Sequence, residues 1–187
     1  MRSMLINGVS RGGRLLILVL DSLLLMGIYW SQLAYHRLSI IWVIAAMVAY
    51  LGLLALTFLG ERVLLTQHVA QLTVDLGLFF GLYALLLLSF PQAFRTGLGG
   101  GPALLFSVVG LPLPYVPRNG WVGVRVPWTM TSPLIWHKTN LLAARFMVPF
   151  GGVLLLANLV GASLLMLVVG TGLLVVTVGG YSYWLTH

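Results

Sequence analysis

The 187-residue sequence contains no cysteine and only three acidic residues, and charged residues of both signs make up 7% of it. The lack of cysteine excludes disulfide bonds, thiol catalysis and thiolate metal sites. Three acidic residues nearly exclude catalysis by paired carboxylates. The histidines show no metal-ligand spacing with one another or with another ligand; they are His36, His68, His137 and His187. We therefore expect neither a metal nor a cofactor.

Hydrophobic residues, by contrast, make up 60% of the sequence, and its mean hydropathy is +1.04. A soluble domain carries about 25% charged residues, and this chain has too little polar surface to cover so large an apolar core. The composition predicts an all-α integral membrane protein. Its net charge of +7 then reflects which loops face the cytoplasm, so we expect no direct contact with nucleic acid.

Six apolar runs predict six transmembrane helices in a single membrane domain, residues 1–187. The runs cover residues 15–32, 38–59, 72–90, 102–116, 139–159 and 160–184. The first run does not read as a cleavable signal peptide, because it contains Asp21, ends in Tyr29-Trp30 and lacks a small-residue cleavage site. It is expected to stay in the membrane as the first span.

Local signals refine these spans. Prolines follow the short fourth run and prevent a regular helix at its end; they are Pro112, Pro114 and Pro117. Ser132-Pro133 predicts the start of a helix that continues into the fifth span. Asn158 and Gly161 predict a tight turn between the last two spans, and residues 63–71 are expected to form a short interfacial helix.

Six spans place both chain ends on one side of the membrane. Seven Lys and Arg residues then lie on that side and two on the other: Arg2, Arg11, Arg14, Arg62, Arg118, Arg125 and Lys138 against Arg37 and Arg95. Basic loops favour the cytoplasm. The count predicts that both termini are cytoplasmic, as is a segment rich in Pro, Trp and Arg, residues 118–140, between the fourth and fifth spans.

Asp21, Asp75 and Arg145 are ionisable residues inside the predicted spans. Charged groups are costly there and tend to face the protein interior with a partner. All three fall in the cytoplasmic half of the membrane, with Asp21 and Arg145 about 9 Å deep. Two interpretations stay open: a polar site or ion path, and a structural ion pair that fixes helix packing. We expect Arg145 to pair with Asp21 or Asp75.

The segment 118–140 combines three basic residues with three tryptophans: Arg118, Arg125, Lys138, Trp121, Trp128 and Trp136. Arg125 suits an acidic or phosphate partner, because its guanidinium is a charged fork of donors. Trp128 and Trp136 are expected to anchor the segment at the membrane interface. Asn119 and Thr129 are expected to hold its fold by hydrogen bonds. An ordinary amphiphilic loop in the aromatic belt would show the same composition.

The motif residues follow one another at defined spacings: Asn119, Gly123, Arg125, Pro127, Trp128, Thr129, Trp136, Thr139 and Asn140. This pattern resembles the signature of the SdpI family, the immunity proteins for the sporulation-delaying peptide toxin. One position differs from the family. A basic residue often follows the Thr–His/Asn pair, whereas Leu141 stands here and Arg145 lies one helical turn further along.

The resemblance implies a multi-pass protein of the bacterial cytoplasmic membrane that binds rather than catalyses. The family's best-known member protects its cell from the toxic peptide and holds a transcriptional repressor at the membrane. The implied partners are therefore membrane lipids, a peptide toxin and a cytoplasmic repressor.

Two other functions compete with immunity. A small transporter or lipid-binding protein would use the Asp21, Asp75 and Arg145 layer. An enzyme acting on a lipid is the weakest alternative, because no nucleophile and base occur together in the sequence.

Overall fold

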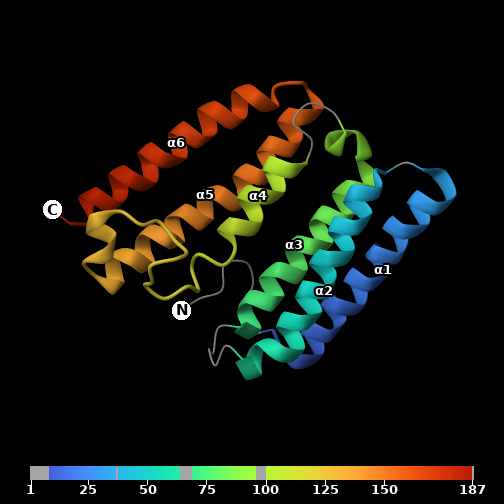
Figure 1. Cartoon of the computed structure of the whole chain (residues 1–187), viewed down its shortest axis with the longest axis horizontal. Helices are drawn as coiled ribbons and strands as arrows, with labels where there is room; N and C mark the ends of the chain where they lie inside the picture. The colour runs from blue at the N-terminus through green and yellow to red at the C-terminus, as the bar shows by residue number, and fades with distance from the viewer. Residues whose placement is uncertain (1–8, 37, 64–68, 96–99, 187) are drawn as a thin grey trace. The chain divides into compact units, whose positions relative to one another are not determined.

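The computed structural model describes residues 9–36, 38–63, 69–95 and 100–186 of the chain. Over these ranges the chain forms helices joined by turns, without β-strands (Figure 1). The helices are α1 (Arg11–Tyr35), α2 (Ile40–Val63), α3 (Val69–Ser89), η1 (Pro91–Phe94), α4 (Gly101–Gly110), η2 (Pro127–Met130), α5 (Pro133–Leu159) and α6 (Ser163–Trp184). The predicted all-α fold class is confirmed.

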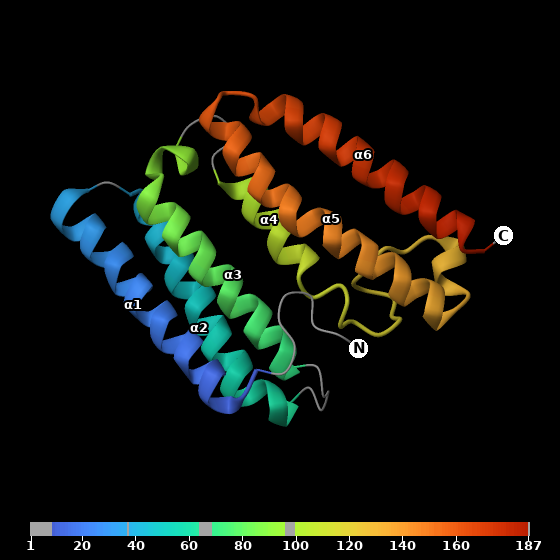
Figure 2. The ribbon, with the colours of Figure 1, turned by 180° about the vertical axis from the view of Figure 1, so that it is seen from behind.

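The chain divides into two compact units, Met1–Gln92 and Ala93–His187. In the first unit α1, α2 and α3 all pack against one another (Figure 2). In the second unit α5 lies between α4 and α6 (Figure 1), and η2 contacts both α5 and α6. The predicted single membrane domain stays a prediction.

Close contact between α1 and α3 holds the first unit together. Gly77 and Gly81 of α3 are four residues apart, one above the other on the helix. A Cβ atom at Gly77 would lie 2.7 Å from the Ile17 side chain, and one at Gly81 would lie 2.9 Å from a carboxylate oxygen of Asp21. Small residues at this spacing let membrane helices approach closely.

Helices α4 and α5 pack with similar closeness in the second unit. The Ser107 hydroxyl of α4 donates a hydrogen bond of 3.0 Å to the Val148 carbonyl of α5. A Cβ atom at Gly151 of α5 would clash with Ser107, and one at Gly170 of α6 would clash with the Phe150 ring. Small residues therefore set the spacing of α5 from both neighbouring helices.

Helix α4 is shorter than the predicted fourth span. It ends at Gly110 instead of Val116, and turns follow over residues 111–115, because Pro112 and Pro114 lack the N–H that a helix needs. Ten helical residues are about 15 Å long, half of a hydrocarbon core of about 30 Å. In the described ranges five helices are long and apolar enough to span a membrane. A sixth crossing at α4 stays a prediction.

The helix predicted to start at Ser132-Pro133 is confirmed. The Ser132 hydroxyl accepts a hydrogen bond of 3.2 Å from the Leu134 N–H at the start of α5. Helix α5 then continues to Leu159, and Gly161, with φ of 74°, forms the predicted turn. Helix α6 consequently starts at residue 163 instead of 160. Of the interfacial helix predicted at residues 63–71, residues 64–68 lie outside the described ranges.

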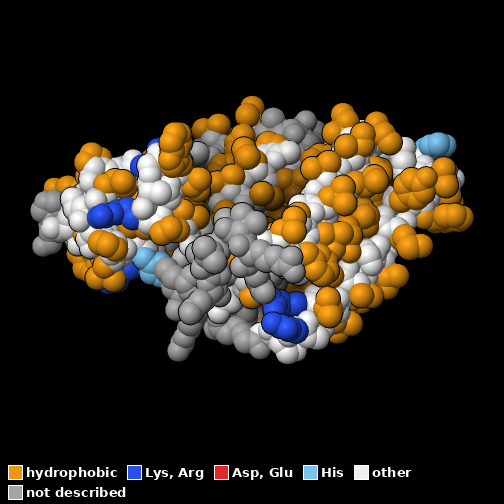
Figure 3. Space-filling view, turned by 60° about the horizontal axis from the view of Figure 1, so that its bottom comes forward, with side chains coloured by type: hydrophobic (Ala, Val, Ile, Leu, Met, Phe, Trp, Pro, Cys, Tyr) orange, Lys and Arg blue, Asp and Glu red, His pale blue; other side chains and the backbone are white. Residues whose placement is uncertain are grey.

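Large apolar side chains are exposed along the long helices, as with Met26, Ile41, Leu85 and Val176. Hydrophobic side chains cover much of the face shown in Figure 3. A soluble protein rarely exposes apolar patches of more than a few hundred Å². Together with the five long apolar helices, this surface identifies a multi-pass membrane protein.

Candidate functional site

The predicted motif begins in a folded segment between α4 and α5 and continues into the first turns of α5. Asn119 organises the first turn of the segment. The Asn119 side-chain oxygen accepts hydrogen bonds from the N–H groups of Trp121 and Val122, at 2.7 and 2.8 Å. Its amide nitrogen donates to the Pro117 carbonyl at 2.7 Å. The Asn119 side chain thus hydrogen-bonds backbone groups both before and after it in the chain, as Asn side chains commonly do in turns.

Gly123 brings the segment back against α5. Its φ is 128°, and a Cβ atom there would lie 2.5 Å from the Trp136 ring and 2.9 Å from the Asn140 side-chain oxygen. That oxygen accepts a 2.9 Å hydrogen bond from the Val124 N–H. The Trp136 indole donates to the Val116 carbonyl at 3.1 Å. Trp136 and Asn140 are 2% and 1% exposed, so these motif residues form a packed contact.

Thr129 holds the short helix η2. Its hydroxyl accepts a hydrogen bond of 3.1 Å from the Val126 N–H and donates one of 2.8 Å to the Val124 carbonyl. Pro127 occupies the first position of η2, where its fixed φ and missing N–H are tolerated. Thr129 is fully buried, so its hydroxyl supports the backbone of the segment from inside.

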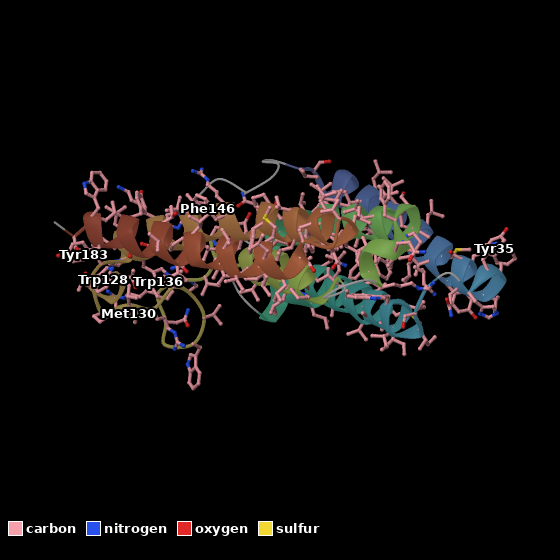
Figure 4. All side chains as sticks on the ribbon, turned by 90° about the horizontal axis from the view of Figure 1, so that it is seen from above. Tyr35, Trp128, Met130, Trp136, Phe146 and Tyr183 are labelled. Atoms are coloured by element: carbon pink, nitrogen blue, oxygen red, sulfur yellow. The ribbon has the colours of Figure 1, made fainter. Side chains whose placement is uncertain are left out.

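Trp128 joins the segment to the end of α6. Its indole donates a 2.9 Å hydrogen bond to the Ser182 hydroxyl. Its ring meets the Tyr183 ring edge to face, with centroids 5.8 Å apart, and Figure 4 shows the two residues at the same end of the second unit. The segment is therefore attached to α5 through Trp136 and to α6 through Trp128.

The arginines of the segment are exposed. Arg125 donates a hydrogen bond to the Gly120 carbonyl, and Arg118 donates one of 3.0 Å to the Met130 carbonyl. A guanidinium carries five N–H donors, so each arginine keeps donors for an external acceptor. Residues 93–187 include no Asp or Glu, so no carboxylate side chain of the second unit can neutralise these arginines.

The exposure of the three tryptophan rings differs from the prediction. The role of interfacial anchor assigned to Trp136 is wrong, because its ring is buried in the contact with Gly123. Trp128 is partly buried against α6. The exposed ring is that of Trp121, which is 88% exposed and lies between motif positions. Thr139 is also fully buried, and its hydroxyl oxygen has no hydrogen-bond partner among the described residues.

The ionisable residues of the predicted polar layer fall in different units. Asp21 is 2% exposed and Asp75 is fully buried, both in the first unit, and one Asp21 carboxylate oxygen lacks a hydrogen-bond partner in the described ranges. Arg145 is exposed on α5 of the second unit. Because the two units are not placed relative to one another, the pairing of Arg145 with either carboxylate stays a prediction.

Sequence reasoning missed Ser182 and Val116, which bind the two motif indoles. Ser182 lies 54 residues from Trp128, in an apolar helix, and no local pattern marks it. Val116 contributes only its backbone carbonyl, which any residue would provide. Neither position carries a signal that could have been found without the tertiary structure.

Comparison with known families agrees with the motif. Residues 115–182 match the sequence profile of the SdpI/YfhL protein family. No curated protein and no solved structure matches the chain significantly. The matched range contains the Asn119 turn, η2, the whole of α5 and α6 as far as Ser182. The predicted resemblance to the SdpI family is confirmed over residues 115–182, which match the SdpI/YfhL family.

Proposed function

We propose that this protein is a membrane immunity or sensor protein, which protects a bacterial cell from a membrane-active peptide toxin. It resides in the cytoplasmic membrane and works by binding rather than by catalysis. Residues 118–140 are essential to this protection. When toxin is present, this segment holds a cytoplasmic repressor at the membrane.

The observation that carries the proposal is the family match over residues 115–182, which coincides with one folded structure. The segment is attached to two apolar helices, through Trp136 on α5 and Trp128 on α6. A toxin that perturbs either helix would therefore also perturb the segment. The exposed Arg125 supplies a charged group through which the segment meets an anionic partner.

A protection assay tests this function. A toxin-sensitive bacterial host expresses the wild-type chain or Arg125→Gln, together with the short secreted peptide encoded nearest the gene. We expect wild-type cells to grow and Arg125→Gln cells to stop growing, although both proteins reach the membrane in equal amounts. Arg11→Gln removes another exposed arginine, outside the segment, and should protect fully. Full protection by Arg125→Gln, or none by the wild type, would overturn the proposal.

The proposal also requires the segment to face the cytoplasm. Single cysteines at Thr131 and Gly97 can be labelled selectively, because the chain has no other thiol. In intact cells an impermeant thiol reagent should label position 97 and not position 131. Labelling at 131 alone would reverse the orientation. Labelling at both would show that α4 does not cross the membrane.

A small transporter is the second candidate, and the buried carboxylate of Asp21 favours it. An acidic side chain within a membrane span, with an oxygen that lacks a partner in the described ranges, is a common feature of transport pathways. This candidate makes a different prediction. Asp21→Asn would change the uptake of a solute into proteoliposomes while protection against the peptide stays unchanged.

A further inference from the structure

The turn that presents Trp121 is a preorganised surface feature. Asn119 fixes both sides of the turn through three short hydrogen bonds, and Arg125 donates to the Gly120 carbonyl at its tip. Because the backbone is already held, placing the Trp121 ring against a partner costs little conformational entropy. We call residues 119–125 the Trp121 turn.

An exposed tryptophan on such a turn suits a partner that offers both apolar contact for the ring and an acceptor for the indole N–H. Trp121 is 88% exposed and the adjacent Val122 is 46% exposed. The other tryptophans of the segment are held by Ser182 and by the Val116 carbonyl. The Trp121 turn therefore presents an apolar tip that the rest of its own unit does not cover.

The position of the segment indicates which partner this is. Trp128 fastens it to Ser182, near the C-terminal end of the apolar helix α6. Tyr183 and Trp184 are exposed at the same helix end, and Figure 4 shows Tyr183 close to Trp128. Tyr and Trp at the end of an apolar helix mark the level of the lipid headgroups. The Trp121 turn belongs to the segment that Trp128 fastens to this helix end.

The charge of the second unit indicates the chemistry of the partner. Between residues 93 and 187 the sequence has no acidic residue, and the segment 118–140 carries three basic ones: Arg118, Arg125 and Lys138. Arg118 and Arg125 flank the apolar tip and are exposed. Clustered basic residues next to a membrane span bind anionic lipids, and guanidinium groups suit phosphate oxygens.

We propose that the Trp121 turn docks into the headgroup layer of an anionic phospholipid membrane. The Trp121 ring lies between headgroups, and the Arg125 guanidinium binds a lipid phosphate, with Arg118 contributing to the attraction. The inference rests on the proposed function in one respect: it names the anionic partner of Arg125 in that site. A change in the anionic lipid headgroups on the side of the membrane where the segment lies would then alter the contacts of the turn.

Difference fluorescence tests the inference on the full-length protein. The spectrum of the wild type minus that of Trp121→Phe isolates Trp121, because the other tryptophans are common to both. The Trp121 side chain is 88% exposed, so the variant should fold normally. The protein is placed in phosphatidylglycerol nanodiscs, in phosphatidylcholine nanodiscs, and in detergent with inorganic phosphate. Accessibility is measured by acrylamide quenching of the difference signal.

We expect Trp121 emission to shift to shorter wavelength and quenching to fall in phosphatidylglycerol, less so in phosphatidylcholine, and not at all with inorganic phosphate. Arg125→Gln should lower the equilibrium constant for shielding in phosphatidylglycerol by about fivefold, the effect of one basic contact at a membrane surface. Arg11→Gln should leave this constant unchanged.

Three results would overturn the inference. If acrylamide quenches Trp121 as strongly in phosphatidylglycerol as in detergent, the ring faces water and not lipid. A protein would then be the partner of the turn. Shielding by inorganic phosphate alone would indicate a site for the free ion. An equal effect of Arg11→Gln would indicate general surface charge. The protection assay fails independently: shielded Trp121 without protection refutes the immunity function, and protection with accessible Trp121 refutes only the lipid contact.

Discussion

Replacing Gly123 by alanine tests whether the segment is held on α5 as the structure shows. A residue with a side chain at φ of 128° costs about 1–3 kcal/mol in backbone strain. The new Cβ atom would also lie 2.5 Å from the Trp136 ring, which must move. That movement breaks the indole hydrogen bond to the Val116 carbonyl, and an unpaired buried donor costs about 1–3 kcal/mol. We expect a total loss of about 3 kcal/mol or more.

The assay is thermal unfolding of the purified protein in detergent, followed by tryptophan fluorescence. For a chain of this size 1 kcal/mol corresponds to about 2–4 °C in Tm, so Gly123→Ala should lower the Tm by about 6–12 °C. Gly120→Ala is the matched control. Gly120 lies in the same turn, has open space around it and does not have a positive φ. Its Tm should stay within about 2 °C of the wild type.

Equal Tm values for the two variants would refute this reasoning. They would mean that the contact of Gly123 with Trp136 and Asn140 does not stabilise the protein. A fall in Tm for Gly120→Ala alone would mean that the tip of the turn, which the structure leaves open, carries the stability instead.

Two further predictions concern helix contacts and use the same assay. In the first unit Gly81→Ala should destabilise by about 1–3 kcal/mol, since its Cβ would lie 2.9 Å from Asp21. Gly52→Ala, with nothing near it, should be neutral or stabilise by about 0.5–1 kcal/mol, and equal effects would contradict the close contact. In the second unit Trp128→Phe and Ser182→Ala should each cost about 1 kcal/mol. The double variant should cost no more than either, and additive losses would show that the two residues are not coupled.

Several features of the fold follow from short stretches of sequence. Apolar runs predicted the long helices, because partition into lipid depends on the residues of each run. Ser132-Pro133 predicted the start of α5, and the cap forms within two residues of the chain. Gly161 predicted a turn, since its φ of 74° is open to glycine and costly for other residues. Each of these effects is local, so the sequence is sufficient to find them.

The motif was also found from sequence, but the roles of its residues were not. Composition placed Trp128 and Trp136 at the membrane interface. The structure buries Trp136, ties Trp128 to α6 and exposes Trp121. The indole is amphipathic in every case, so the residue type does not reveal whether its N–H meets a backbone carbonyl, a side chain or a lipid.

Tertiary structure alone decided how the helices face one another. In a soluble protein, amphipathic periodicity shows which face of a helix is buried. In these helices the lipid-facing and protein-facing sides are both apolar, so the pattern carries little of that information. The contacts are instead made by small residues and single hydrogen bonds, such as Gly81 against Asp21 and Trp128 with Ser182. These partners lie far apart in the chain and meet only because α1 packs on α3 and the segment returns to α6.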